Sequence, residues 1–332
     1  MKKEKFFQLA EVALSLLIVV GIYWLGENLK LPEKIIPITP SIIEGRDEFY
    51  AGVIVGEKVR WVVGKKGKIL RSESNGAGWN PQNSGVKTAL HGIAAWDEKK
   101  AVVVGNDGLV LLTHDSGNAW EKVQLGNERL GVKLLKVRID PEGVAWTVGA
   151  MGAVYASNDT GKSWRRMARA QDIAWNDVGF SPDGKVWLVG EFGHVVFADP
   201  KHVDDKGELE WQAVKVSADR SLMAVIFLDA QTALIAGLDG TLLRTKDSGK
   251  SWEKVLLPTR EHVFALASNG YTTVGVGSRG LRIVSQQEGS SWEVGRVAKE
   301  DFNWHTDIAI KGEEQLIVGA SLGQMTAGNR KL

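Results

Sequence analysis

The sequence contains no cysteine, and this absence excludes several kinds of chemistry at once. Disulfide bonds, thiolate metal sites, thiol nucleophiles and a lipid-modified N-terminal cysteine all need a residue that the 332-residue chain does not have. Proline is scarce, at 8 residues, and 41 Lys and Arg nearly balance 40 Asp and Glu. Nucleic-acid binding usually needs a clearly basic surface, so we expect no nucleic-acid partner.

The sequence also lacks the patterns of metal and phosphate sites. The six histidines show no pair spaced i,i+4 on a helical pattern, which is the arrangement of helical zinc sites. The glycine turns described below join two strands, and they lack the helix and lysine that follow a phosphate loop. We therefore expect no metal and no cofactor.

One long apolar run stands at the N-terminus. Residues 6–26 (FFQLAEVALSLLIVVGIYWLG) can span a bilayer core of about 30 Å at about 1.5 Å per helical residue. Three lysines within residues 1–5 favour a cytoplasmic basic tail, and a tyrosine and a tryptophan suit the far interface. The alternative is a cleaved signal peptide, but no small-x-small cleavage site follows the run. We expect an uncleaved transmembrane helix, with the rest of the chain on the periplasmic side of a bacterial inner membrane.

A carboxylate interrupts this run near its cytoplasmic end. Glu11 is about 7–8 Å from that end by helical rise. A carboxylate inside a bilayer is costly and often faces a protein partner, so Glu11 is a candidate membrane contact with a partner. The alternatives are that its side chain reaches the interface or is protonated.

A glycine motif recurs seven times after a proline-containing linker over residues 27–46. Each copy is a Val-Gly or Ala-Gly step with a second glycine shortly after it, as in VVGNDG and LVGEFG, between apolar β-branched residues. A period of 40 to 47 residues indicates a repeat fold, and the pattern is typical of a β-hairpin whose glycines adopt positive φ at the turn. The first glycines of the seven copies are Gly64, Gly105, Gly149, Gly190, Gly237, Gly277 and Gly319.

A turn that ends in tryptophan follows the glycine motif in the first six repeats. Five copies have the form of THDSGNAW or SQQEGSSW, and the fourth, DDKGELEW, is looser. Aspartates such as Asp115, Asp159 and Asp247 can accept backbone N–H bonds that close the turn, and the tryptophan can bury its ring against a neighbouring sheet. The tryptophans are Trp79, Trp120, Trp164, Trp211, Trp252 and Trp292.

The repeats predict an all-β fold. A short apolar segment precedes each glycine motif by about a dozen residues, so each repeat offers four strands, and seven such units predict a seven-bladed β-propeller over residues 47–332. The seventh repeat is short and has no room for the tryptophan turn. Because an open sheet edge exposes unpaired backbone, we expect residues near Ile42–Tyr50 to supply its missing outer strand.

The tryptophan turns resemble the Asp-box, or BNR, repeats of sialidases and related propellers. The glycine hairpin joined to such a turn, over about residues 47–327, more closely resembles the photosystem II stability/assembly factor family. The resemblance implies a non-enzymatic propeller that helps a membrane complex assemble, and family members in bacteria without photosystems are often associated with RND-type exporters. The chain departs from the family pattern in having an apolar helix where a lipoprotein cysteine is expected.

Basic residues recur in the segments that follow the tryptophans. We expect the loops from the outer strand of one repeat to the inner strand of the next to share a face with the glycine turns. Cations there would suit an acidic protein surface or an anionic ligand; the alternative is a solvated rim neutralised by nearby carboxylates. The predicted partner-binding residues are Lys87, Arg129, Arg165, Arg166, Arg169, Arg220, Arg260 and Arg296.

Lys136, Asp177 and Asp307 precede the apolar residues of predicted inner strands and are expected at the channel mouth. Two carboxylates there suggest acid–base chemistry, although aspartates at strand starts also form turns.

The sequence leads to two hypotheses about function. The first is a non-enzymatic assembly factor or accessory subunit of an integral membrane complex, either an assembly client or a transporter such as an RND-type exporter. The alternative is a glycan-binding or glycan-hydrolysing propeller of the cell envelope.

Overall fold

The computed structural model describes residues 14, 16–24, 42–44, 46–125, 131–205, 207–286, 289–320 and 322–325. The chain divides into two compact units, Met1–Ser41 and Ile42–Leu332. In the first unit, residues 16–24 are helical and most of their large apolar side chains are exposed. No helix among the described residues is long and apolar enough to cross a membrane. Most of the predicted anchor over residues 6–26, including Glu11, lies outside the described residues.

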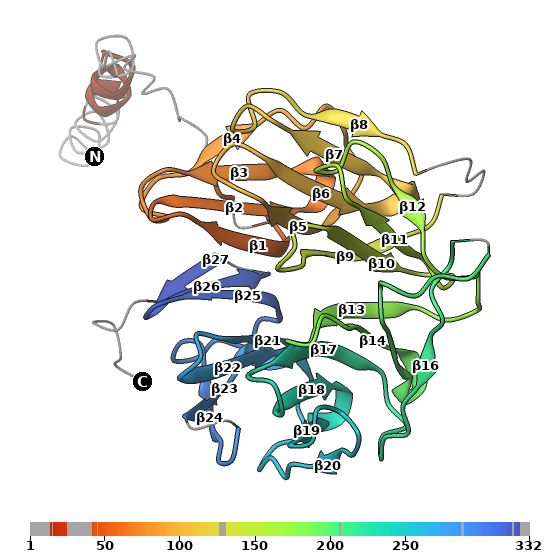
Figure 1. Ribbon diagram of the computed structural model, residues 1–332. Helices are drawn as coiled ribbons and strands as arrows, with labels where there is room; N and C mark the ends of the chain where they lie inside the picture. The colour runs from red at the N-terminus through yellow and green to blue at the C-terminus, as the bar shows by residue number, and fades with distance from the viewer. Residues whose placement is uncertain are drawn as a thin grey trace, which may run out of the picture. The chain divides into compact units, whose positions relative to one another are not determined.

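Four-stranded antiparallel sheets make up most of the second unit (Figure 1). We call them blades 1 to 6 in chain order, and within each blade the strands follow one another in chain order from the innermost to the outermost. Blade 1 contains β1 (Phe49–Val55), β2 (Val59–Gly64), β3 (Ile69–Ser72) and β4 (Asn80–Gln82). Blade 2 contains β5 (Leu90–Ala95), β6 (Ala101–Gly105), β7 (Val110–Thr113) and β8 (Glu121–Val123). Blade 3 contains β9 (Leu134–Ile139), β10 (Ala145–Gly149), β11 (Val154–Ser157) and β12 (Arg165–Arg166).

The next three blades repeat the same order. Blade 4 contains β13 (Trp175–Phe180), β14 (Val186–Gly190), β15 (Val195–Ala198) and β16 (Gln212–Ala213). Blade 5 contains β17 (Leu222–Phe227), β18 (Ala233–Gly237), β19 (Leu242–Thr245) and β20 (Glu253–Lys254). Blade 6 contains β21 (Val263–Ser268), β22 (Thr272–Gly277), β23 (Leu281–Gln286) and β24 (Glu293–Arg296). The repeat period therefore predicted the four-stranded blades, but the structure has six complete ones where seven were predicted.

The last repeat forms a sheet of only three strands, which we call the terminal sheet. It contains β25 (His305–Lys311), β26 (Glu314–Gly319) and β27 (Leu322–Met325). The prediction that residues near Ile42–Tyr50 complete this sheet was wrong. Phe49 and Tyr50 belong to β1, and Phe49 pairs with Gly64 of blade 1 instead. Six four-stranded blades thus form, rather than seven.

The innermost strands of the sheets form a closed ring. Each contacts the innermost strands of both neighbouring sheets, and β25 of the terminal sheet contacts β1 of blade 1. Blade 1 and the terminal sheet meet through polar contacts as well as apolar packing. The Gly52 N–H donates to Asp307 Oδ2 at 3.0 Å, and Arg60 Nε donates to Glu314 Oε1 at 2.7 Å. Among the described residues, ring closure therefore relies on side chains rather than on a sheet shared by both ends of the chain.

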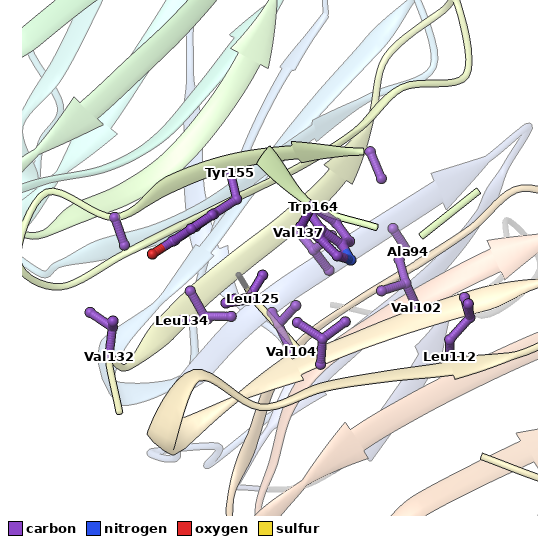
Figure 2. Close-up of a cluster of buried hydrophobic side chains, with 13 residues drawn as sticks. Ala94, Val102, Val104, Leu112, Leu125, Val132, Leu134, Val137, Tyr155 and Trp164 are labelled. Carbon is purple, nitrogen blue, oxygen red and sulfur yellow. The ribbon is translucent and has the colours of Figure 1, made fainter. Parts of the chain in front are cut away.

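Apolar clusters fill the interfaces between neighbouring sheets. Figure 2 shows the cluster between blades 2 and 3, in which Val104 and Leu112 of blade 2 meet Leu134 and Tyr155 of blade 3. Burying a side chain of this size contributes about 1.5–3 kcal/mol relative to leaving it exposed. The stability of the ring is therefore spread over its interfaces.

The tryptophan of each turn packs against the preceding sheet, as the sequence predicted. Trp164 of blade 3 is 8% exposed and lies in the cluster with blade 2, and Trp252 of blade 5 packs against the cluster with blade 4. Trp79 of blade 1 packs beside Leu316 of the terminal sheet, so the same contact also crosses the closure of the ring.

The two glycines of each hairpin motif have different roles. In the first six repeats the second glycine has positive φ, as in Gly193 at +72°, and the residue before it also does, as in Phe192 at +54°. Two consecutive residues with positive φ are the requirement of a type I′ hairpin turn. The first glycine does not have the predicted positive φ, because Gly190 is extended at −155°. A Cβ on Gly190 would lie 2.4 Å from the carbonyl oxygen of Ala174, so this position needs glycine for close backbone approach.

The aspartates of the tryptophan turns close those turns, as predicted. Asp159 Oδ1 accepts hydrogen bonds from the Ser157 hydroxyl at 2.8 Å and from the Ser163 N–H at 2.9 Å. Burial raises the pKa of Asp159, but hydrogen bonds from Ser163 and Ser157 outweigh it and lower the pKa to about 2. Asp247 makes the equivalent bonds, and its pKa is also lowered to about 2, chiefly by hydrogen bonds from Ser251. These carboxylates are structural.

Candidate functional site

One face of the propeller is formed by the hairpin turns together with the loops that lead from one sheet to the next. We call these connections the D–A loops and this side the D–A face. Backbone bonds join the two sets: Gly108 N–H donates to Val132 O at 2.6 Å, and Gly280 N–H donates to Asn303 O at 2.5 Å. The prediction that the glycine turns and the D–A loops share a face is confirmed by these bonds.

Four of the predicted partner-binding cations lie on D–A loops. Lys87 and Arg260 are exposed and make no ion pair with a described residue. Arg169 and Arg220 are paired: Arg169 lies 3.1 Å from Glu208, and Arg220 lies 3.1 Å from an Asp239 oxygen in the hairpin turn of blade 5. The face therefore carries charges of both signs, and two of its four cations are available to pair with a carboxylate of a partner.

Three further predicted cations do not lie on loops. Arg165 and Arg166 form β12, and Arg296 ends β24, because the outer strand begins directly after the tryptophan. Arg166 lies over the Tyr155 ring, and Arg296 donates to both oxygens of Glu261 at 2.6 and 2.9 Å. Their placement in D–A loops was a wrong prediction. Arg129, the eighth predicted cation, lies outside the described residues.

A ring of half-buried side chains surrounds the channel at this face. Each is the second residue of an innermost strand, so every sheet contributes one. Together with Lys136 they line a cavity of about 230 Å³. Sequence reasoning missed most of them, although each lies 13 or 14 residues before the first glycine of its repeat. We call them the mouth ring: Tyr50, His91, Leu135, Asn176, Met223, Phe264 and Thr306.

Aromatic contacts and burial set the chemistry of this mouth. The Tyr50 ring stacks on Trp304 at a centroid distance of 5.9 Å and lies 5.2 Å from the His91 ring. Burial, with donation of its hydroxyl to Glu48 at 2.9 Å, raises the pKa of Tyr50 to about 12. Burial lowers the pKa of His91, so this imidazole is neutral at pH 7. The mouth ring is therefore uncharged near neutral pH.

The predicted channel residues occupy the next position along the innermost strands. Lys136 Nζ lies 2.7 Å from Asp307 Oδ1, which joins blade 3 to the terminal sheet. Lys136 lines both the cavity of the mouth ring and a second cavity of about 430 Å³ deeper in the channel, which Asp307 also lines. The prediction that Lys136 and Asp307 converge in the channel is consistent with this geometry, and their ion pair lies between the two cavities.

Asp177 is placed differently. Its two oxygens accept from Arg138 Nε and a terminal nitrogen of Arg138, both at 2.9 Å, and Oδ2 also accepts from the Val225 N–H at 3.1 Å. Burial alone would lower the pKa of Arg138, but Asp177 raises it. Arg138 could not be selected from the sequence, because its partner lies 39 residues away on another strand.

Asp177 and Asp307 therefore share one structural role. Each is buried, is paired with a cation and accepts a backbone N–H from the following sheet: Val225 for Asp177 and Gly52 for Asp307. An acid–base pair needs carboxylates that can exchange protons with a substrate, so this geometry favours neither the glycan-hydrolysing alternative nor the turn-forming interpretation. In the described part of the chain, no group of three or more His, Asp and Glu could hold a metal ion.

The sequence of this chain is similar to the members of one protein family. The model of the family described as Photosynthesis system II assembly factor YCF48 matches residues 53–172, 168–271 and 203–301. The Photosystem II assembly protein Ycf48 of Thermosynechococcus vestitus is 27% identical over 163 residues, covering 49% of this chain and 46% of the relative. The Photosystem II assembly lipoprotein Ycf48 of Synechococcus sp. (strain CC9902) is 25% identical over 241 residues, covering 70% of this chain and 66% of the relative. The chain thus spans about half to two thirds of the length of these relatives.

Solved structures agree on the fold. A structure of YCF48 bound to D1 peptide has a TM-score of 0.70 at 18% identity and covers 85% of this chain and 92% of that chain. YCF48 from Cyanidioschyzon merolae has a TM-score of 0.69 at 17% identity, covering 86% and 98%. The relatives are named assembly factors rather than enzymes, in agreement with the expectation of a non-enzymatic propeller. Since the family model covers well over half of its length, the chain belongs to the Photosynthesis system II assembly factor YCF48 family.

Proposed function

We propose that this protein is a membrane-anchored, non-enzymatic propeller that docks through its D–A face on an integral membrane complex, as an assembly factor or an accessory subunit. Family membership carries the proposal, because several relatives are named assembly lipoproteins and one solved relative is bound to a D1 peptide. This chain has no cysteine for a lipid anchor. The apolar run over residues 6–26 is the feature that would replace it.

Three finer points belong to the same proposal. The terminal sheet is an incomplete seventh blade, since it takes its place in the ring between blade 6 and blade 1. The N-terminal basic tail is cytoplasmic and the propeller lies on the periplasmic side of a bacterial inner membrane, as the lysines before the apolar run favour. The client is an assembling membrane complex or a transporter of RND type. A membrane anchor raises the effective concentration of the propeller near such a client.

The exposed groups of the D–A face support its role in docking. Lys87 and Arg260 are exposed cations without a described ion-pair partner. Met151 and Phe192 are 57% and 70% exposed at the tips of neighbouring hairpin turns. Aromatic residues, methionine and arginine are enriched in protein interfaces.

Charge reversal on two opposite faces tests this proposal. We expect the triple variant Lys87→Glu, Arg220→Glu, Arg260→Glu to lose its membrane partner during purification from native membranes in mild detergent. The matched control, Lys99→Glu, Lys162→Glu, Lys250→Glu, changes the charge equally on exposed residues of the other face and should retain the partner. Retention by both variants, or loss only in the control, would contradict docking through the D–A face.

A further inference from the structure

We infer that the cavity of the mouth ring receives one aromatic side chain of the protein partner. The inference rests on the proposed function, because it names what the D–A face recognises at its centre. Lining residues, cavity size, charge and surroundings support it separately.

Size and shape point to a single ring. The cavity measures about 230 Å³, below the roughly 300–1,000 Å³ of typical small-molecule and cofactor sites. The Lys136–Asp307 ion pair lies between this cavity and the deeper one, so it limits how far an occupant can enter. An extended chain passing through the channel would have to break this pair, whereas one inserted side chain would not.

The lining residues favour an aromatic occupant. Tyr50, His91 and Phe264 offer ring faces or edges, and Met223 and Leu135 offer apolar surface. Aromatic rings prefer partners at centroid distances of about 4.5–7 Å, and methionine sulfur adds favourable contacts with aromatic rings. The Tyr50 side chain already makes such contacts with Trp304 and His91, so its aromatic ring is oriented before a partner binds.

Charge argues against a small anion in this cavity. His91 is neutral near pH 7 because burial lowers its pKa, and Lys136 is already paired with Asp307. Asn176 donates its Nδ2 to Leu222 O at 2.8 Å, while its Oδ1 accepts no hydrogen bond from any described residue. That oxygen can accept from an indole N–H or a phenol O–H, so tryptophan and tyrosine should bind better than phenylalanine.

The surroundings indicate that the ring belongs to a protein. Met151 and Phe192 stand exposed on the same face with φ of +57° and +54°. Positive φ is unusual for bulky residues, and at the same turn position blades 1, 2 and 5 carry lysine or aspartate. Phe302, on the D–A loop before β25, is also 66% exposed. Apolar groups scattered around a small cavity suit a polypeptide better than an isolated small molecule.

Binding of blocked amino acids to the full chain tests the cavity directly. Saturation-transfer NMR would use N-acetyltryptophanamide, N-acetyltyrosinamide and N-acetylphenylalaninamide as probes, with N-acetylleucinamide and N-acetylglucosamine as comparisons. We expect the tryptophan and tyrosine amides to bind at least tenfold more tightly than the leucine amide. Equal binding of the leucine amide, preferential binding of the sugar, or no aromatic binding would overturn the inference.

Variants locate the bound probe. Met223→Trp and Leu135→Trp fill the cavity from different blades, and each should weaken binding of the aromatic amides at least tenfold. Asn176→Ala should remove the preference for tryptophan over phenylalanine. Met151→Ser, on the same face but outside the cavity, should leave probe binding unchanged. If neither cavity-filling variant weakens binding while both retain the wild-type urea midpoint, the probe binds elsewhere and the inference fails.

Purification from native membranes separates this inference from the proposed function. If a membrane complex is recovered with the wild type but not with Met223→Trp, both the proposed function and the inference about the cavity are supported. Recovery of the complex by both proteins would mean that the partner does not use the cavity, which overturns the inference alone. Recovery of the wild type without any partner would overturn the proposed function, and the inference that rests on it, even if the amides bind.

Discussion

The contact between blade 1 and the terminal sheet provides the sharpest stability prediction. Arg60 is 1% exposed in β2, and its guanidinium donates to both carboxylate oxygens of Glu314 in the terminal sheet. Two further bonds, to Val59 O at 2.8 Å and Glu57 O at 3.1 Å, hold the same guanidinium. Glu314→Ala would leave the cation buried with carbonyl partners only.

The size of the effect follows from that burial. Removing one partner of a buried ion pair typically destabilises a protein by about 3–5 kcal/mol. The Glu314 side chain is 15% exposed, so some water reaches the pair, and we expect about 3 kcal/mol. A domain is stable by only about 5–15 kcal/mol in total, so this loss is large. With a urea slope of about 3 kcal/mol per molar, the unfolding midpoint should fall by about 1 M.

Urea unfolding of the full chain in mild detergent, followed by tryptophan fluorescence, measures this change. The double variant Arg60→Met, Glu314→Leu removes both charges and should recover most of the lost stability, since apolar replacements of a buried pair are often neutral. Glu57→Ala removes an exposed pair with Lys311 at the same contact and should change stability by less than about 1 kcal/mol. A loss below about 1 kcal/mol in Glu314→Ala, or no recovery in the double variant, would refute a closure held by this pair.

Three further outcomes follow from the interfaces and turns. Trp164→Ala should cost about 3–5 kcal/mol by urea unfolding because the ring is 8% exposed between two blades; a change near zero would contradict that packing. Gly277→Ala should destabilise far more than Gly78→Ala, because its Cβ would lie 1.7 Å from a backbone carbonyl oxygen, whereas Gly78 lacks positive φ and its Cβ would meet the Ser74 Oγ only at 3.5 Å; equal thermal midpoints would refute the close-approach argument. Asp159 has a folded-state pKa of about 2 against about 3.9 unfolded, so its contribution is present above pH 4 and lost as pH falls toward 2. In Asp159→Asn, the free energy of unfolding should therefore fall less steeply than in the wild type as the pH decreases over that range. The same pH dependence in both proteins would contradict this argument.

Local patterns predicted the blades because each repeat carries its own turns. The glycine hairpin and the tryptophan turn act within one repeat, so their spacing was sufficient to place six complete blades. The first glycine of each hairpin was misinterpreted because its constraint is not local. Gly190 is extended and needs glycine only because the carbonyl of Ala174, the residue directly before β13, approaches it.

Long-range contacts limited the prediction of the site. Lys136 and Asp307 meet across 171 positions of sequence, and Arg138 meets Asp177 from a neighbouring blade. Such pairs become visible only once the innermost strands stand in a ring. The mouth ring was missed for a different reason. Its members, such as Tyr50, Asn176 and Met223, share a position but no chemistry, so no motif links them.

Photo-crosslinking in native membranes tests docking through the D–A face most directly. A photoreactive amino acid would replace Lys87 or Met151 on that face, and Lys162 or Lys250 on the opposite face. Mass spectrometry would then identify what each position captures. The account predicts that Lys87 and Met151 crosslink to an integral membrane protein and that the two opposite positions do not. Capture only from Lys162 and Lys250, or from none of the four, would contradict it.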